Sequence, residues 1–378
     1  MESIGSTISI RCLKTSMTRT CSIERMSNLK ENSALTQANY IFVVQWYGKR
    51  SLIEFRWHCT YNMTGQPIPW LETRLRLITL KRDSQGICSQ NLERFPPIHQ
   101  WALLKLASLR YLGWMYIDII ESELRKGHFK EMYYIDLFSG PGISNIEDSS
   151  AVCYCSPLIV NDLQKQKNKR FTKMFLNDDD KERAEALQLC LDETATTKYE
   201  VTNKDANSCI QEIVPELSEK SHSLIFVDPY STQFSWNSMK TILELDADIF
   251  FLFPTALMPW AVSVAKRPEA DITNFFKECK KALEVFHNPA VRDNRSALFD
   301  LYKKDVEATR GPKTKMESVK IKGSNYYYDM LFVTKKTQVQ RWWSGVTTLK
   351  SKIESYSSTD VDKTLKVILK EQSKLTDF

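Results

Sequence analysis

Tyr133-Tyr134-Ile135-Asp136-Leu137-Phe138-Ser139-Gly140-Pro141-Gly142 is the stretch that decides the fold. A short aromatic and aliphatic run ends on Asp136, and two glycines follow within the next six residues. The pattern predicts a buried strand that ends in a glycine loop, because glycine adopts positive φ and lets the backbone approach a ligand closely. In open α/β sheets this edge is where ligands bind. A tight strand-to-helix turn without a ligand is the alternative, because short glycine motifs often occur by chance.

The composition of the 378-residue chain is that of an ordinary globular protein, with 42% hydrophobic and 26% charged residues. The length is enough for a large core and for more than one domain. Residues 1–94 carry 13 Lys or Arg against 7 Asp or Glu, so the net charge of +6 falls in this region. A basic region favours nucleic acid or another polyanion as a partner, although a solvated basic face is the simpler explanation.

Nine cysteines are scattered along the chain without a CxxC pair. A reducing location with unpaired thiols fits this pattern best, and we expect a cytoplasmic protein. Cys153 and Cys155 form a lone CxC motif, which two buried or loop thiols explain better than a metal site. The uncharged run from Ile249 to Ala265 contains two prolines and is too short for a membrane span, so we expect no membrane association.

Strands and helices alternate after the boundary that Pro96-Pro97 indicates. Apolar residues at helical spacing predict one helix from about Ile98 to Lys126, which Gly127 ends. Further strands are expected at 171–176, 199–201, 223–227, 249–253 and 326–334, with helices at 181–193, 208–217, 236–245 and 342–355. Continuous apolar strands that alternate with helices predict an α/β fold, with a Rossmann-like, mostly parallel sheet and helices on both faces.

Two regions follow from this pattern. Residues 96–378 are interpreted as one α/β domain with a helical C-terminal end. Residues 1–95 are interpreted as a basic N-terminal extension, either small and β-rich or partly disordered. Its strand-like runs lie at 40–47 and 51–59, and residues 71–81 are expected to form a third strand or a short helix.

Four successive strands end in polar clusters that contain Asp136, Asp178, Asp205 and Asp228. Parallel strands bring these ends to one edge of the sheet, where a nucleoside-containing ligand would lie. The order matches the S-adenosylmethionine-binding pattern of class I methyltransferases. In that pattern the first loop cradles the amino acid part, the second acid holds the ribose, and the third lies near the adenine amine. The predicted cofactor-binding residues are Asp136, Phe138, Gly140, Gly142, Asp178 and Asp205.

A nicotinamide dinucleotide is the competing cofactor. Its fingerprint requires a third glycine where Asn145 stands, and bulky Phe138 would crowd a pyrophosphate. A phosphate loop of the nucleotide-hydrolase type is excluded, because no Gly-Lys-Ser/Thr follows the glycines. S-adenosylmethionine is therefore the favoured cofactor.

Asp228-Pro229-Tyr230 partly matches the Asp/Asn-Pro-Pro-aromatic motif of methyltransferases that modify exocyclic amines. In that motif the acid accepts hydrogen bonds from the amine, and the ring stacks on a flat substrate. Asp228 and Tyr230 are accordingly the predicted catalytic residues. Because only one proline is present, an ordinary strand end with a proline turn is the alternative.

The motifs from His99 to Trp343 together resemble the three-Cys-motif partner (TcmP) family, which has a methyltransferase-like domain. The matching pieces are His99 and Lys105 on the long helix, 134–142, Ser156-Pro157-Leu158, 205–207, 226–230 and the late strand that ends in Thr334-Lys335-Lys336. The chain departs from the family at Cys155 and Ser231, where glycine is usual. The resemblance implies a cysteine-motif partner protein of the radical-S-adenosylmethionine type.

Three hypotheses about function follow. The first is an S-adenosylmethionine-dependent methyltransferase that acts on a nucleic-acid base or another amine, with phosphate contacts from residues 1–94 and from the Lys-rich stretch 313–322. The second is a non-catalytic partner module that keeps the fold and works with the cysteine-motif protein. The third is a metal-dependent nuclease that uses Asp178, Asp179 and Asp180, for which a helix N-cap is the better interpretation.

Overall fold

The computed structural model describes residues 10–15, 18–23, 70–81, 88, 92–264, 272–323, 327–335 and 340–375. The chain divides into two compact units, Met1–Ile68 and Pro69–Phe378. This division lies before the Pro96-Pro97 pair at which the sequence indicates a boundary. In the first unit, β1 (Ile10–Thr15) and β2 (Thr18–Ile23) pair as an antiparallel hairpin. The strands expected at 40–47 and 51–59 lie outside the described residues.

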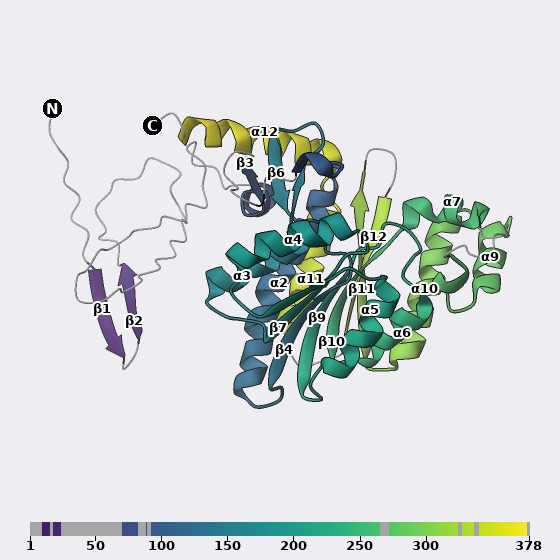
Figure 1. The fold of residues 1–378 in the computed structure, drawn as a ribbon, viewed down its shortest axis with the longest axis horizontal. Coiled ribbons are helices and arrows are strands. Elements are labelled where there is room, and N and C mark those ends of the chain that lie inside the picture. Colours follow the sequence, from purple (N-terminus) through teal and green to yellow (C-terminus); the bar gives the residue numbers. More distant parts are fainter. Residues whose placement is uncertain are drawn as a thin grey trace, which may run out of the picture. The chain divides into compact units, whose positions relative to one another are not determined.

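The second unit contains a seven-stranded sheet in the order β11-β12-β10-β9-β4-β7-β8 (Figure 1). Five neighbouring strands, from β10 to β8, are parallel, whereas β12 runs antiparallel to both β10 and β11. The strands are β4 (Glu131–Asp136), β7 (Lys173–Asn177), β8 (Tyr199–Thr202), β9 (Ser221–Val227), β10 (Ala247–Phe253), β11 (Thr314–Lys322) and β12 (Tyr327–Lys335).

This strand order confirms the predicted fold class. The dinucleotide-binding fold orders six parallel strands as 3-2-1-4-5-6. Here the same order is kept, but the last strand, β12, is inserted antiparallel between the fifth and the sixth. The structure is therefore a Rossmann-like, mostly parallel sheet with one inserted antiparallel strand and helices on both faces.

Side chains of the central strands alternate between two hydrophobic cores. On β4, Met132 and Tyr134 belong to one core, and Tyr133 and Ile135 belong to the other. Burial on both faces explains why the strands are apolar throughout rather than alternating with polar residues.

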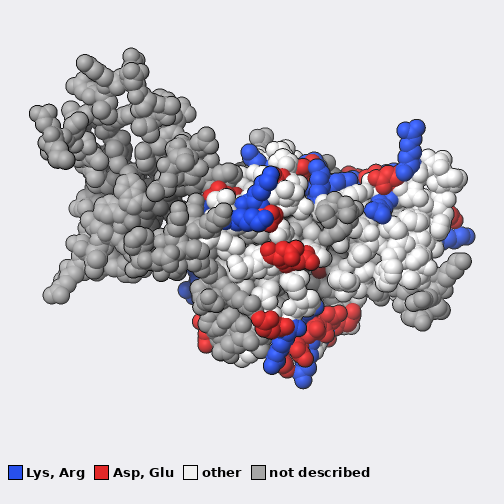
Figure 2. All heavy atoms as spheres, turned by 90° about the horizontal axis from the view of Figure 1, so that it is seen from above, with Lys and Arg blue, Asp and Glu red and all other residues white. Residues whose placement is uncertain are grey.

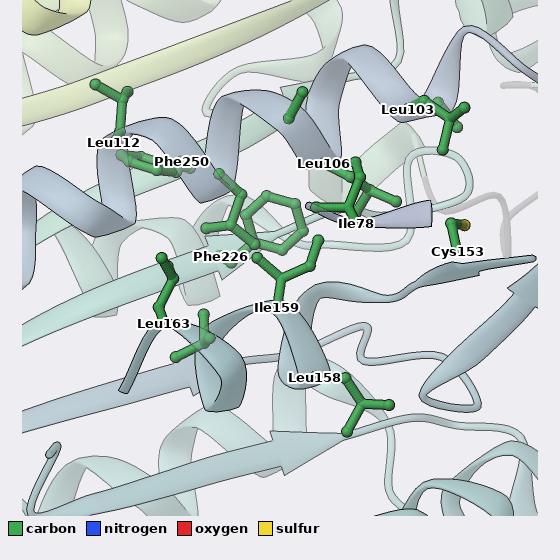
Figure 3. Close-up of a cluster of buried hydrophobic side chains, with 14 of the residues drawn as sticks. Ile78, Leu103, Leu106, Leu112, Cys153, Leu158, Ile159, Leu163, Phe226 and Phe250 are labelled. Atoms are coloured by element: carbon green, nitrogen blue, oxygen red, sulfur yellow. The ribbon is translucent and has the colours of Figure 1, made fainter. Parts of the chain in front are cut away.

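Helices on each face complete the two cores. The first face is covered by α2 (Ala102–Arg125), α3 (Ser156–Lys167), α4 (Lys181–Thr194) and α11 (Gln340–Ile353), and α12 (Ser358–Leu375) adds buried residues to the same core where it packs on α1 (Trp70–Leu75). The second face is covered by α5 (Ala206–Ile213), α6 (Trp236–Glu244), α7 (Met258–Ser263), α8 (Ile272–Phe275), α9 (Cys279–His287) and α10 (Asn294–Arg310). Figure 3 shows the first core, where leucines of α2 lie over Phe226 of β9 and Phe250 of β10.

Helix α2 forms as the sequence predicts, because its apolar residues recur at helical spacing and no proline interrupts them. Gly127, with φ of +77°, follows its last turn. The helix leads directly into β4 and therefore runs back along the sheet. Its first turn, with Lys105, consequently lies at the carboxyl edge of the parallel strands.

A small second sheet was not anticipated from the sequence. After the glycine loop, β5 (Ile143–Asn145) and β6 (Ala151–Tyr154) form a hairpin, and β6 also pairs with β3 (Thr79–Lys81). Residues 71–81, expected as a strand or a helix, contain both, because α1 (Trp70–Leu75) precedes β3. The glycine loop therefore enters a hairpin before it reaches α3.

The cysteines in the second unit are mostly unpaired, as expected. Cys153 is buried and free, and Cys155 is free and partly buried, in agreement with the interpretation of the CxC motif as two thiols. Cys88 and Cys190, however, are joined as a disulfide with their Cα atoms 5.0 Å apart. This pair departs from the expectation of unpaired thiols. Among the described residues, no helix has the length and apolar character needed to cross a membrane.

Candidate functional site

The candidate site lies at the point in the sheet where the order of the strands reverses. The chain passes from β4 to β7 and β8 on one side, and then returns to β9 on the other side of β4. In open α/β sheets this switch point, at the carboxyl ends of the strands, is the place for a ligand. Asp136 ends β4 and Asp228 directly follows β9, so these two acids border the switch point.

Asp136 is fully buried and held by hydrogen bonds from its own neighbourhood. Its carboxylate accepts the hydroxyl of Tyr134 at 2.8 Å and the amide of Phe138 at 3.3 Å, and Ser156 at the start of α3 also donates to it. Burial raises the pKa of Asp136 to about 7, despite these donors. The nearby Asp228 carboxylate raises the pKa further. Asp136 therefore changes its charge near neutral pH.

The glycine loop adopts the backbone that its sequence predicts. Gly140 and Gly142 have φ of +66° and +89°, which side chains disfavour. The amide of Gly140 donates to the carboxylate of Asp178 at 2.8 Å. A Cβ on Gly142 would make ordinary van der Waals contacts with Leu158 of α3 and Leu187 of α4 at 3.4–3.5 Å, so the positive φ rather than a lack of space favours glycine there.

The side chain of Asp178 is buried and holds the glycine loop by a hydrogen bond rather than extending into solvent. It is 4% exposed, burial raises its pKa, and it also accepts the amide of Asp180 at 3.1 Å. Asp180 in turn caps α4 by accepting the amide of Arg183. This confirms the N-cap interpretation of the aspartate triplet. Among the described residues, no group of His, Cys, Asp or Glu has the arrangement of a metal site.

Asp205 is exposed and caps α5, because its carboxylate accepts the amides of Asn207 and Ser208, both at 3.0 Å. Asn207 connects this helix to the segment after β9 by donating to the carbonyl of Gln233 at 2.9 Å and accepting the amide of Ser235 at 2.8 Å. The ends of β8 and β9 are thus tied together, with Asp205 at the surface.

Asp228 forms an ion pair with Lys105 of α2, and both side chains are mostly buried, at 14% and 16% exposed. Tyr230, two residues later, is 85% exposed, which is unusual for so large a ring. Ser231 is 8% exposed, and its hydroxyl has no hydrogen-bond partner among the described residues. The segment after β9 therefore presents a carboxylate, a free ring and an unsatisfied hydroxyl.

Aromatic side chains border this segment. Trp101, just before α2, stacks on Tyr328 of β12 with ring centroids 4.6 Å apart. The ammonium of Lys105 lies 5.8 Å from the centre of the Trp101 ring. Phe138 of the glycine loop is half-buried and makes an edge contact with Phe234 at 6.3 Å.

The structure thus brings most of the predicted residues to one edge. Asp136, Gly140 and Gly142 belong to the loop after β4, and Asp178 after β7 is hydrogen-bonded to that loop. Asp228 lies beside Asp136. Sequence reasoning did not assign a role to Lys105, Trp101 or Ser231. The signal that could have pointed to Lys105 was its position four residues after Trp101 at the beginning of a helix, since that spacing places both on one face.

Comparisons with known proteins give only distant similarity. No protein-family model and no curated protein matches the chain, so the TcmP family is not shown. Among solved structures, protein LPL1258 from Legionella pneumophila is similar at a TM-score of 0.39 and 10% identity, over 65% of this chain and 91% of that one. A putative O-methyltransferase from Klebsiella pneumoniae has a TM-score of 0.35 and 10% identity, over 67% and 90%. The O-methyltransferase TomG from Streptomyces achromogenes, solved with S-adenosylmethionine, has a TM-score of 0.33 and 12% identity, over 61% and 81%. At these scores none of the three identifies a family or an activity for this chain.

Proposed function

We propose that this protein is an S-adenosylmethionine-dependent methyltransferase that modifies an amine of a nucleobase. The observation that carries the proposal is the pairing of Asp228 with Lys105 at the switch point. In the Asp/Asn-Pro-Pro-aromatic motif the acid binds the amine that is methylated. Here that acid is Asp228, and its carboxylate binds the ammonium group of Lys105. Tyr230, two residues later, is an exposed aromatic ring on which a flat nucleobase can stack.

The residues of the loop fit the proposed cofactor. Gly140 and Gly142 leave the backbone of the loop without side chains at positive φ. Asp136, Phe138 and the two glycines would hold the amino acid part, with Asp178 supporting the loop and Asp205 at the far end near the base. The buried hydroxyl of Ser231, which has no hydrogen-bond partner among the described residues, is a further group that a ligand can bind.

When bound, the cofactor would supply an electrophilic methyl group on its sulfonium sulfur, for transfer to the amine nitrogen. This chain's own residues would orient the acceptor. Asp228 accepts a hydrogen bond from the amine and takes up the proton that it loses, and the Tyr230 ring holds the base. Positioning of this kind can supply several kcal/mol of the barrier reduction, since effective molarities of well-oriented groups reach about 10⁵ M or more.

Calorimetry with S-adenosylmethionine tests the cofactor, and transfer of a labelled methyl group to single-stranded RNA or DNA tests the reaction. We expect binding by the wild-type protein, weaker binding by Asp136→Ala, and binding without methyl transfer by Asp228→Ala. The exposed Asp179→Ala serves as the control, because that side chain lies outside the loop contacts. A wild-type protein that binds no S-adenosylmethionine would refute the proposal.

We also propose the narrower assignment to the TcmP family, with a cysteine-motif partner protein. It is supported by the placement of the matching motifs: 134–142 forms the end of β4 and its loop, Ser156-Pro157 opens α3, and 226–230 forms the end of β9. Methyl transfer that appears only in the presence of the partner would support this assignment. In the alternative function, the partner would bind Asp228→Ala as well as wild type, and neither protein would transfer a methyl group.

A further inference from the structure

A cavity of about 360 Å³ lies on the second face of the sheet, at the same edge as the candidate site. We call it the α9–α10 pocket. It is lined by Pro259, Phe286, Arg292, Asp293, Asn294, Arg295 and Tyr327. Most of these residues come from the connection between α9 and the start of α10, and Tyr327 is the first residue of β12.

Positive charge predominates in the α9–α10 pocket. Arg292 and Arg295 line it, and among the described residues neither guanidinium has an ion-pair partner. Lys320 of β11 adds a third cation, because its ammonium lies 3.6 Å from the centre of the Tyr327 ring. Asp293 is the acid among the lining residues, so the two lining arginines exceed the negative charge, and Asp329 lies opposite Lys320 across the β11–β12 pair.

Asp293 is already engaged within the protein. It accepts the amide and hydroxyl of Ser296 at 3.2 and 2.7 Å, and the hydroxyl of Tyr327 at 3.4 Å. The hydrogen bond from Ser296 is the main reason that the pKa of Asp293 is lowered. Because Asp293 caps α10 and fixes Tyr327, it does not also neutralise the two arginines by direct contact. Two free guanidinium groups are the preferred partners of a phosphate, which they bind through paired N–H donors.

The remaining lining groups suit a nucleotide beside that phosphate. Tyr327 supplies a fixed ring, and Pro259 and Phe286 supply apolar contacts. Asn294 donates to the carbonyl of Phe286, which leaves its buried Oδ1 atom without a hydrogen-bond partner among the described residues. A nucleobase amine or sugar hydroxyl would satisfy that acceptor.

The register of the sheet places the α9–α10 pocket near the proposed acceptor position. Phe253 at the end of β10 pairs with Asp329, so Tyr327 extends two residues beyond this pair at the carboxyl edge. One strand, β10, separates β12 from β9, and two strand spacings amount to about 10 Å. The pocket lies on the second face and Lys105 comes from α2 on the first face, so a single strand with its base at Asp228 would cross the carboxyl edge of the sheet to place one of its phosphates in this pocket.

The face of the molecule in Figure 2 has no predominant charge, so attraction of a phosphate there depends on local groups. Figure 2 shows Lys and Arg interspersed with Asp and Glu on the described surface of one face. We infer that the α9–α10 pocket binds a phosphodiester of a single-stranded nucleic-acid substrate. This inference rests on the proposed function for its substrate, but its test does not require activity.

The test compares two double variants of the full chain by fluorescence anisotropy with a labelled single-stranded oligonucleotide of mixed sequence. Arg292→Gln/Arg295→Gln removes two positive charges from the α9–α10 pocket. Arg125→Gln/Arg170→Gln removes the same charge from exposed positions at the opposite edge, at the end of α2 and before β7. We expect the pocket variant to bind about tenfold or more weakly than wild type. We also expect its salt dependence, the slope of log K against log salt, to be smaller by about 1.4.

The control variant should keep the wild-type affinity and slope. Calorimetry with S-adenosylmethionine should give the same affinity for both variants as for wild type, and a failure of wild type in that experiment would refute the proposed cofactor rather than the pocket. Equal oligonucleotide binding by all three proteins, or no binding by wild type, would overturn the inference. Displacement of the oligonucleotide by a nucleoside monophosphate at micromolar concentration would assign the pocket to a small phosphate ester and overturn the single-strand assignment.

Discussion

At the scale of single residues, Asp136 gives the protein a pH-dependent stability. Its pKa rises from 3.8 to about 7 on folding, so the folded state keeps a proton that the unfolded chain has already released between these pH values. The free energy of unfolding therefore falls as pH rises from about 4 to 7, by up to about 4 kcal/mol.

The substitution Asp136→Asn tests this dependence, because asparagine is neutral at every pH. Urea denaturation from pH 4.5 to 8 should show the variant gaining stability relative to wild type as pH increases. Asp179→Asn, at an exposed position, should follow the wild-type curve. The same pH slope in wild type and in Asp136→Asn would contradict the assignment.

The ion pair between Lys105 and Asp228 couples α2 to β9, and a double-mutant cycle measures it. Lys105→Met keeps the length of the side chain but leaves Asp228 without its cation, and Asp228→Asn has the converse effect. Because both groups are mostly buried, we expect each variant to be less stable, and the two effects to differ from additivity by about 0.5–3 kcal/mol. Urea denaturation of the four proteins provides the values. Additive effects would show that the pair contributes no stability.

At the scale of elements, the glycine loop is held both by its backbone and by its contacts. Gly142→Ala introduces a Cβ at φ of +89° that also meets Leu158 and Leu187. Gly127→Ala is a matched control, because Gly127 has φ of +77° and no atom within 4 Å of an added Cβ. Because the added Cβ of Gly142→Ala makes only ordinary van der Waals contacts, we expect both variants to lose about 1–2 kcal/mol through their positive φ. We expect Gly142→Ala alone to lose affinity for S-adenosylmethionine as well.

Thermal denaturation and calorimetry of the two variants separate strain from packing. If Gly142→Ala loses much more stability than Gly127→Ala, the contacts of the added Cβ with α3 and α4 are unfavourable in addition to the backbone strain. If S-adenosylmethionine affinity falls equally in both, the loop has no specific part in binding.

Regular elements were predictable from the sequence because they obey simple periodicities. The strand at 133–137 and helix α2 can each be predicted from the hydrophobic pattern of their own residues. The β5–β6 hairpin was not predictable, because its strands are 3 and 4 residues long and are completed by β3, more than 60 residues earlier. The role of Lys105 was hidden for the same reason, since its partner Asp228 lies 123 residues away.

At the scale of the whole molecule, the two cores determine where the chain can be divided. Leu71, Leu75, Ile78 and Leu92 are all buried in the first core, together with α2. The sequence indicated a boundary at Pro96-Pro97 because a proline pair often ends an element. Such a local signal contains no information about the packing of these leucines on a distant sheet.

Two truncations make this point testable. A chain that begins at Pro69 should fold, because both described cores lie within it. A chain that begins at Pro96 loses the four buried residues, which contribute on the order of 6–12 kcal/mol, comparable with the whole stability of a domain. Circular dichroism and thermal unfolding should show a cooperative transition for the first chain and a lower or absent one for the second. Equal melting temperatures would contradict this division.

The inserted strand also has a consequence for the order in which a newly synthesised chain can be completed. In the sheet, β11 pairs only with β12, although β12 follows it in the chain. While β11 has left the ribosome and β12 is still inside it, β11 has no neighbour and the edge of β10 is open. Unpaired strand edges favour association with other chains. The nascent protein is therefore most exposed to aggregation just before its last strand emerges, and chaperones that bind extended segments would act at that moment.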